Sequence, residues 1–343
     1  MPPIKLLIVD DSPLAVRHLA ALFARDPAFA LVGTAHSGRE GVALAASLRP
    51  DVVCMDINMP DIDGFEATRQ IMATAPLPIV IVSATYDPHQ VAMAFRALEV
   101  GALAILEKPP AGDTPECRLR QTALLETFRA MAARHAPRRR EAAVRPVPQT
   151  RPVVPPEVLL IGASTGGPQA IHTLLKGLPP SFPLPILVVQ HMSPGFSAGF
   201  AHWLSQSTPW SVALAEEGEA PQPGRVYLAP EKIHMEWQAD RRIHLLPGER
   251  EHGVCPSVSR LFRSALAVGG GRVLAVLLSG MGKDGAAELK ALHDAGAQTI
   301  AQDQATSVVH GMPGEAIRLG GASQILPVQE IAAALCRALG LPV

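Results

Sequence analysis

The chain has 343 residues, 48% of them hydrophobic and 18% charged, and its 30 Lys and Arg residues nearly cancel its 31 Asp and Glu residues. This length predicts about two domains of roughly 150 residues each. The formal net charge of -1 excludes the global basic field expected of a protein that binds nucleic acid.

The first residues, MPPIKLLIVDDS, place two aspartates directly after a short apolar run. This pattern is too short and too acidic for a secretory signal peptide. No stretch reaches the roughly 18 to 20 apolar residues of a membrane-spanning helix. The cysteines lie far apart without metal-binding spacing, which favours reduced thiols. We therefore expect a cytoplasmic protein that inserts no segment into a membrane.

Strand and helix patterns alternate at the start of the chain. Residues 4–9 (IKLLIV) form a continuous apolar run, typical of a strand that is buried on both faces. Further strands are expected at residues 30–35, 51–55, 78–83 and 102–106. Helices are expected at residues 14–24, 38–48, 64–72 and 90–100, and a last one extends to about residue 133. Five strand–helix units with short connections predict a doubly wound parallel sheet over residues 1–133.

Residues 134–156 (RHAPRRREAAVRPVPQTRPVVPP) interrupt this alternation. The segment is rich in Pro and Arg and lacks apolar periodicity, so it cannot bury enough apolar surface to fold. We interpret it as a linker between two domains. A patch of arginines that binds nucleic acid or a membrane is the less favoured alternative.

The alternation resumes in residues 157–343. Strands are expected at residues 158–161, 185–190, 272–278 and 299–301, and helices at residues 169–176, 285–295 and 315–320. Residues 216–247 differ, since they show short strands with Pro-Gly and Ala-Asp turns. These features predict a second α/β domain with a doubly wound parallel sheet and an inserted antiparallel β-hairpin.

Polar residues stand at the carboxyl ends of the first predicted strands, where functional groups gather in open parallel sheets. They are Asp10, Asp11, Asp56, Ser83 and Lys108. Converging carboxylates repel one another and need a cation, and hard oxygen ligands suit Mg²⁺. A lysine and a hydroxyl beside them suit an incoming phosphoryl group. Each Asp alone could be a helix cap, but the set predicts phosphoryl transfer to a carboxylate.

This constellation resembles the response-regulator receiver domain over about residues 4–125. The resemblance implies that Asp56 accepts the phosphoryl group, that Ser83 is the switch hydroxyl and that Lys108 contacts the phosphate. It also implies a Mg²⁺ site made by Asp10, Asp11, Asp56 and the backbone carbonyl of Asn58. The implied phosphodonor is a histidine kinase.

The stretch LLIGASTGGPQAI, at residues 159–171, is compatible with two chemistries. A glycine-rich turn that opens a helix can bind a phosphate through backbone N–H groups, or it can present Ser164 as a nucleophile in a G-x-S-x-G elbow. The phosphate alternative lacks a G-x-G-x-x-G spacing, a Walker lysine and an acidic residue for a ribose. The sequence therefore favours the nucleophile.

A nucleophilic serine needs a base and an orienting carboxylate from neighbouring strand ends. His191 directly follows the strand expected at residues 185–190, and Asp284 follows the strand expected at residues 272–278, at the first turn of the next helix. Taken singly, Ser164 and Asp284 could be helix caps, and His191 could have only a packing role. The joint placement of the three residues favours a Ser-His-Asp triad. The loop at residues 280–282 and the helix opening at residues 165–167 offer N–H groups for an oxyanion hole.

Six motifs over about residues 157–340 resemble the chemotaxis response-regulator protein-glutamate methylesterase (CheB) family. They are IGASTGGP, VVQHM, GEAPQPGRVYLAP, CPSVSRLFRSA, LLSGMGKDGAAEL and AQDQATSVVHGMP. The resemblance implies Ser164 as nucleophile, His191 as base and Asp284 as its orienting group. It also implies an oxyanion donor at Met281, and the helix opening described above adds Thr165 as a second donor. Ser259 stands where family members often have Asp.

The resemblance further implies the substrate and the pathway. The family hydrolyses glutamate γ-methyl esters on the cytoplasmic helices of chemoreceptors, many members also deamidate receptor glutamines, and the kinase is that of chemotaxis. No metal is expected in the ester hydrolysis. We expect the unphosphorylated receiver to block the esterase and phosphorylation of Asp56 to relieve the block. Two other hypotheses are a non-catalytic phospho-dependent docking module and a nucleotide-binding regulator that uses residues 162–167.

Overall fold

The structure is a computed structural model, and it describes residues 2–83, 88–134 and 154–342. The chain divides into two compact units, Met1–Arg139 and Arg140–Val343. Most of the linker predicted over residues 134–156 lies outside the described residues. Among the helices within the described ranges, none is both long enough and apolar enough to cross a membrane.

The first unit alternates strands and helices. They are β1 (Ile4–Val9), α1 (Pro13–Ala24), β2 (Phe29–Ala35), α2 (Gly38–Leu48), β3 (Val52–Met55), α3 (Gly64–Thr74), β4 (Ile79–Ser83), α4 (Pro88–Glu99), β5 (Ala104–Glu107) and α5 (Pro115–Arg134). The strand order is β2-β1-β3-β4-β5, with parallel pairing throughout. This confirms the five-stranded doubly wound sheet predicted for this part of the chain.

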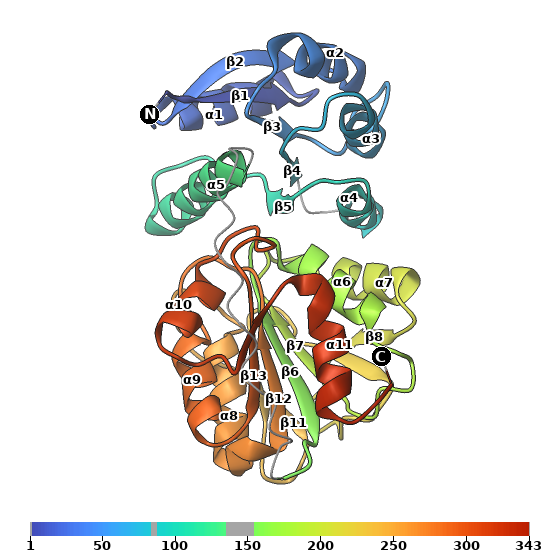
Figure 1. The fold of residues 1–343 in the computed structure, drawn as a ribbon. Helices are drawn as coiled ribbons and strands as arrows, with labels where there is room; N and C mark the ends of the chain where they lie inside the picture. Colours follow the sequence, from blue (N-terminus) through green and yellow to red (C-terminus); the bar gives the residue numbers. More distant parts are fainter. Residues whose placement is uncertain (1, 84–87, 135–153, 343) are drawn as a thin grey trace. The chain divides into compact units, whose positions relative to one another are not determined.

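Helices cover both faces of this sheet. Figure 1 shows α1 and α5 on one face and α2, α3 and α4 on the other. The rings of Phe23 on α1 and Phe128 on α5 meet edge to face with centroids 5.0 Å apart. Ser12 caps α1 by accepting a hydrogen bond from Ala15 N at 3.3 Å, and Pro13 begins the helix. The cap ends the short loop that follows β1, so Asp10 and Asp11 are held at the carboxyl end of this strand.

The second unit is built around a seven-stranded sheet. Its elements are β6 (Val158–Ala163), α6 (Gly167–Gly177), β7 (Ile186–Gln190), α7 (Ser197–Ser207), β8 (Ser211–Leu214), β9 (Arg225–Leu228), β10 (His234–Trp237), β11 (Ile243–Leu246), α8 (Val258–Gly269), the 3-10 helix Gly270–Arg272, β12 (Val273–Leu277), α9 (Ala286–Asp294), β13 (Gln298–Gln302), α10 (Met312–Arg318), β14 (Gln324–Leu326) and α11 (Val328–Ala338). The sheet order is β14-β13-β12-β6-β7-β9-β8, and its pairings are parallel.

The predicted doubly wound parallel sheet and the inserted hairpin are both confirmed, since β10 and β11 pair antiparallel. The expectation that residues 216–247 form only this insertion is wrong. Strand β9 lies in the main sheet, parallel to β7, because Val226, Tyr227 and Leu228 are buried there. The prediction also missed α7, β8, α8, the 3-10 helix Gly270–Arg272, β14 and α11.

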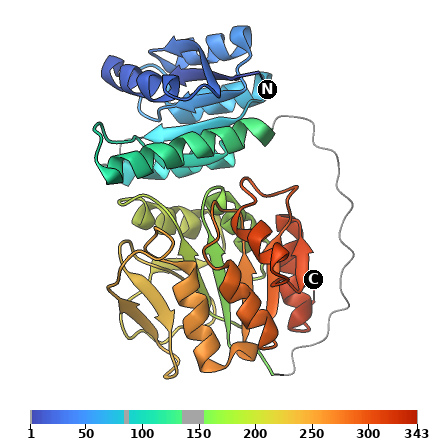
Figure 2. The ribbon, with the colours of Figure 1, turned by 90° about the vertical axis from the view of Figure 1, so that its left-hand side faces the viewer.

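The helices of the second unit form two layers (Figures 1 and 2). Helices α8, α9 and α10 lie on one face of the sheet, and α6, α7 and α11 lie on the other. Strand β6 is buried along its whole length, with β12 and β7 as its neighbours. The carboxyl ends of these three strands therefore lie side by side, and they lead into the segments that contain Ser164, His191 and Asp284.

Candidate functional site

Ser164 follows β6 directly, in a tight turn that leads into α6. Its N–H donates to Ser279 O at 3.0 Å, and its carbonyl accepts from Gly167 N at 2.8 Å. Gly166 has a φ of 78°, in the left-handed region that favours glycine. A Cβ at Gly166 would lie 2.3 Å from Val308 Cβ. The turn thus requires glycine at position 166, and it holds Ser164 directly after the carboxyl end of β6.

His191 follows the neighbouring strand. Gln190 at the end of β7 is the register partner of Ala163 at the end of β6, and His191 N donates to Ala163 O at 3.0 Å. Ser164 and His191 are therefore the next residues on two adjacent strands. The hydrogen bonds among the described residues do not include one between Ser164 Oγ and the His191 ring.

His191 and Asp284 are joined directly. His191 Nε2 lies 2.8 Å from Asp284 Oδ2. Because carboxylate oxygens only accept hydrogen bonds, Nε2 is the protonated nitrogen and Nδ1 keeps the lone pair of the neutral ring. In chymotrypsin-like triads the carboxylate bonds Nδ1 instead, so the two ring nitrogens exchange roles here. The structure thus brings Asp284 into contact with His191. Asp284 lies two residues before α9 and not within its first turn.

The carboxylate of Asp284 lies at the start of helix α8 and is buried. Oδ1 accepts from Ser257 Oγ at 2.8 Å and from Ser259 N at 3.0 Å, and Oδ2 accepts from Val258 N at 2.7 Å. Burial alone raises the pKa of Asp284, but the bonds from His191, Ser259 and Ser257 outweigh it and hold the pKa well below its ordinary range. Asp284 is therefore an anion beside the imidazole.

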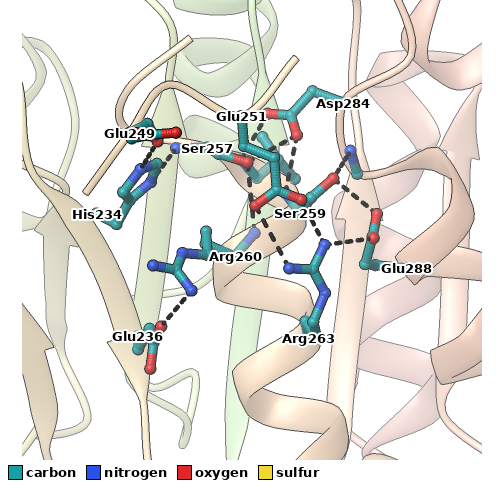
Figure 3. A network of polar contacts seen from close by, with 12 residues as sticks. His234, Glu236, Glu249, Glu251, Ser257, Ser259, Arg260, Arg263, Asp284 and Glu288 are labelled. Atoms are coloured by element: carbon teal, nitrogen blue, oxygen red, sulfur yellow. Dashed lines mark hydrogen bonds and ion pairs between the residues drawn. The ribbon is translucent and has the colours of Figure 1, made fainter. Parts of the chain in front are cut away.

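Further polar contacts connect Asp284 to the surface (Figure 3). Ser259 Oγ accepts from Gly285 N at 2.8 Å and donates to Glu288 Oε2 at 2.7 Å. Glu288 Oε1 pairs with Arg263 at 2.9 Å, and Arg263 also pairs with Glu251 at 2.5 Å. The hydroxyl of Ser259 thereby fastens the Asp284 loop to α8 and α9.

Ser257 is held from its other side by a buried histidine (Figure 3). His234 Nδ1 accepts from Ser257 N at 3.2 Å, and His234 Nε2 lies 2.9 Å from Glu249 O. A nitrogen that accepts an amide hydrogen carries a lone pair, and a carbonyl needs a donor, so this imidazole is neutral with its proton on Nε2. His234 therefore fixes the residue that caps α8 and binds Asp284.

The loop after β12 passes close to Ser164. A Cβ at Gly280 would lie 2.9 Å from Ser164 Cβ. Gly280 N donates to Val309 O at 2.9 Å, and Gly280 O accepts from Gly311 and Met312 N at 3.0 and 2.9 Å. Met281 follows Gly280, and Thr165 follows Ser164. In the described residues, the N–H groups of Met281 and Thr165 donate no hydrogen bond, as oxyanion donors require.

The first unit gathers the predicted acidic residues at the ends of β1 and β3. Ligand oxygens of Asp10, Asp11 and Asp56 lie within 4.8 Å of one another. Lys108 Nζ lies 2.8 Å from Asp10 Oδ2 and 3.2 Å from Asp56 Oδ1. Three converging carboxylates of this kind fit Mg²⁺, which takes oxygen ligands.

The surroundings of Asp56 change the pKa of its carboxyl group. Burial raises the pKa of Asp56 to about 6, with Lys108 lowering it and Asp10 raising it further. Asn58 N donates to Asp56 Oδ2 at 3.3 Å. Ser83 is buried at the end of β4, and Ser83 O accepts from Lys108 N at 2.9 Å. The structure thus brings together the side chains of Asp10, Asp11, Asp56 and Lys108 and places Ser83 on the adjoining strand end.

Comparison with known proteins identifies both parts of the chain. Residues 159–335 match the family model described as CheB methylesterase, and residues 6–115 match the response regulator receiver domain. The chain belongs to the CheB methylesterase family. It is 45% identical to "Protein-glutamate methylesterase/protein-glutamine glutaminase 1" of Syntrophus aciditrophicus, over 98% of this chain and 99% of that protein.

Two further proteins give matches consistent with this family. A protein of Methanospirillum hungatei, "Protein-glutamate methylesterase/protein-glutamine glutaminase 2", is 44% identical over 96% of each chain. The crystal structure of the Thermotoga maritima CheB methylesterase catalytic domain is 36% identical, with a TM-score of 0.52 over 54% of this chain and 99% of that one.

Sequence reasoning missed several residues around this CheB site. Ser257 and Val258 bind Asp284 from the start of α8, a helix that was not predicted. Ser259 was noted only as a departure from the family pattern. The signal that could have found them is the serine directly before an amphipathic run, VSRLFRSALAVG, since a serine there is typical of a helix cap.

Proposed function

We propose that this chain is a protein-glutamate methylesterase in which Ser164 is the nucleophile, His191 the base and Asp284 the group that orients the base. The observation that supports it most is the 2.8 Å contact of His191 with Asp284, which lie in the segments after β7 and β12, the two neighbours of β6. The substrates are glutamate γ-methyl esters on the cytoplasmic helices of chemoreceptors, so the reaction takes place in the cytoplasm.

The geometry supports an acyl transfer through Nδ1 of His191. Ser164 Oγ attacks the γ-carbonyl carbon of the ester while Nδ1 takes its proton. Asp284 stabilises the imidazolium through Nε2–H. Nδ1 then protonates the leaving methoxide oxygen, which departs as methanol. Water, activated in the same way, cleaves the glutamyl-enzyme ester and returns Ser164 with a glutamate. The missing contact from Ser164 to His191 forms with substrate bound.

The N–H groups of Met281 and Thr165 stabilise the oxyanion of both tetrahedral intermediates. Each donor of this kind typically contributes roughly 10² to 10³ in rate. The same steps act on a receptor glutamine, with ammonia leaving in place of methanol. This gives the chain a glutaminase activity, in line with the double names of its relatives.

The receiver unit regulates the esterase through phosphorylation. Asp56 accepts a phosphoryl group from a chemotaxis histidine kinase, and Lys108 and Ser83 bind its oxygens. Asp10, Asp11, Asp56 and the carbonyl of Asn58 would hold a Mg²⁺ ion, which would supply positive charge next to the phosphoryl group. The unphosphorylated receiver inhibits the esterase unit, and phosphorylation shifts the population toward the active arrangement.

Methanol release from methylated receptor tests the proposal. Wild type, S164A and D56N are each assayed with and without acetyl phosphate as phosphodonor. We expect phosphodonor-stimulated release for wild type, unstimulated release for D56N, and background for S164A. Full activity of S164A would contradict the triad and favour a docking module. A chain lacking residues 1–140 should be more active than the unphosphorylated full chain, and equal or lower activity would contradict inhibition.

A further inference from the structure

Gln190 lies between the two reacting turns. It is the last residue of β7, and 4% of its surface is exposed. Because Gln190 pairs with Ala163 in the sheet, the residues that follow the two partners are Ser164 and His191.

The amide of Gln190 binds the backbone of both. Nε2 donates to Ser164 O at 2.8 Å and to His191 O at 2.7 Å. A side-chain NH₂ group has two hydrogens, so both are used. Carbonyl oxygens only accept, so the nitrogen of the amide, and not its oxygen, must face them. A side chain without two donors could not make this bridge.

The other end of the amide is closely packed. Gln190 Oε1 is buried and accepts no hydrogen bond among the described residues. A Cβ at Gly167, the first residue of α6, would lie 2.0 Å from this oxygen. Glycine at this position therefore leaves room for the amide. A buried oxygen without a partner is unfavourable, and an apolar side chain would avoid it. The bridge between the two carbonyls would then be lost, and Ser164 O would keep only its bond from Gly167 N.

We propose that Gln190 is a positioning residue for the hydrolytic reaction, which fixes the separation of Ser164 Oγ and the His191 ring by bridging the two backbones. The inference rests on the proposed function, because it requires Ser164 and His191 to react together. Gln190 acts through two carbonyl groups and touches no reacting atom. Its loss therefore lowers kcat and leaves KM unchanged, since small misplacements of reacting groups cost rate.

The first test is Q190M in the full chain, phosphorylated with acetyl phosphate and assayed for methanol release from methylated receptor. Methionine keeps the length of the side chain and removes both donors. We expect kcat to fall by roughly 10- to 100-fold, with KM within twofold of wild type. The matched control is Q324M, which removes a buried amide from β14, three strands away from β6 in the same sheet.

The second test is the pH dependence of Q190E. An ionised carboxylate would face two carbonyl oxygens, whereas the protonated acid donates to one of them. We expect the kcat of Q190E, relative to wild type, to rise as the pH falls. A packing role alone predicts a ratio that does not change with pH. If Q190M does not fold, Q190N replaces it, since Asn keeps the amide but shortens its reach by one methylene.

S164A, assayed in parallel, distinguishes a failure of the positioning role of Gln190 from a failure of the proposed function. If S164A is inactive and Q190M keeps the kcat of wild type, the positioning role is wrong and the triad stands. If S164A keeps its activity, the proposed function fails, whatever Q190M does. Loss of kcat in Q190M, with Q324M and KM unchanged, supports the role of Gln190.

Discussion

The carboxylate of Asp284 holds Nε2 of His191 at 2.8 Å while the first N–H groups of helix α8 hold the carboxylate. The positive end of a helix dipole favours an anion at this place. Asp284 therefore has two tasks, since it neutralises the start of α8 and it dictates which nitrogen of His191 carries the proton.

The first prediction concerns D284N. The Asn amide can turn its NH₂ toward Nε2, which must then accept, so the proton moves to Nδ1 and this atom can no longer act as a base. We expect kcat for methanol release to fall by about 10⁴. D294N, at the exposed end of α9, is the control and should keep its activity. A kcat of D284N within tenfold of wild type would show that Asp284 does not set the tautomer.

The second prediction concerns the close approach at Gly280. A Cβ there would lie 2.2 Å from Met312 Sδ and 2.9 Å from Ser164 Cβ. We expect G280A to lower kcat by at least tenfold and the free energy of unfolding by about 1–3 kcal/mol. G177A on helix α6 is the control, because its Cβ would lie 2.9 Å from Ala332 Cβ, so it should lose stability without losing kcat. Equal kcat values for the two variants would contradict a role for the Gly280 loop.

The third prediction concerns the buried charge of Asp56. Its pKa is raised to about 6, above the value near 3.9 of the unfolded chain. A raised carboxyl pKa means that the ionised group destabilises the fold above about pH 6, and that this penalty disappears as the pH falls toward 4. In buffer with EDTA, chemical unfolding should show D56N to be more stable than wild type at pH 7.5 by about 1–3 kcal/mol.

The difference between D56N and wild type should vanish near pH 4. Added Mg²⁺ should stabilise wild type more than D56N, because a cation offsets the repulsion among the three carboxylates. The prediction is wrong if D56N is the less stable protein at pH 7.5 in EDTA. Differential scanning calorimetry with and without Mg²⁺ checks the metal dependence independently of phosphorylation.

The fourth prediction concerns His244 on the β10–β11 hairpin. Its ring lies between two carboxylates, with Nε2 2.9 Å from Asp240 Oδ2 and Nδ1 3.0 Å from Glu217 Oε1. The hydrogen bond to Asp240 is the main reason that the pKa of His244 is raised, and Glu217 adds to it. A raised histidine pKa stabilises the fold below the unfolded value near 6.5, and this contribution is lost as the pH rises through the folded pKa.

We therefore expect wild type to exceed H244Q in free energy of unfolding by about 1 kcal/mol or less at pH 5.5, since the pair is partly exposed. The difference should shrink above pH 7 and in high salt. Urea unfolding at several pH values measures it, with H252Q on a neighbouring loop as the control. A difference that grows with pH would contradict the prediction.

The sequence predicted the strand ends well where a continuous apolar run ends in polar residues. Strands β6, β7 and β12 are buried throughout and β1 is buried over its last four residues, so the ends of these strands were predicted to within two residues. Asp10, Ser164 and His191 directly follow β1, β6 and β7. Adjacent parallel strands then bring these residues together without any further information.

Other features depend on contacts that a local pattern does not contain. Strand β9 (RVYL) is short, and its pairing with β7 is fixed by burial on both sides of the sheet. The contacts of Gln190 follow from the register of β6 and β7, and that register cannot be derived from either strand alone. The same holds for Ser259, because its partner Asp284 lies in a loop and its partner Glu288 lies in α9, about thirty residues further along.

The strand orders of the two sheets explain why both sites lie where they do. In the first unit the chain runs from β1 to β2 and returns to place β3 on the other side of β1; in the second it runs from β6 to β7 and returns to place β12 on the other side of β6. Such reversals open a crevice at the carboxyl ends of the two neighbouring strands. The same reversal of strand order thus occurs at the candidate site of each unit. The side chains that follow these strands differ between the two units, with Asp10, Asp56 and Lys108 in the first and His191 and Asp284 beside Ser164 in the second.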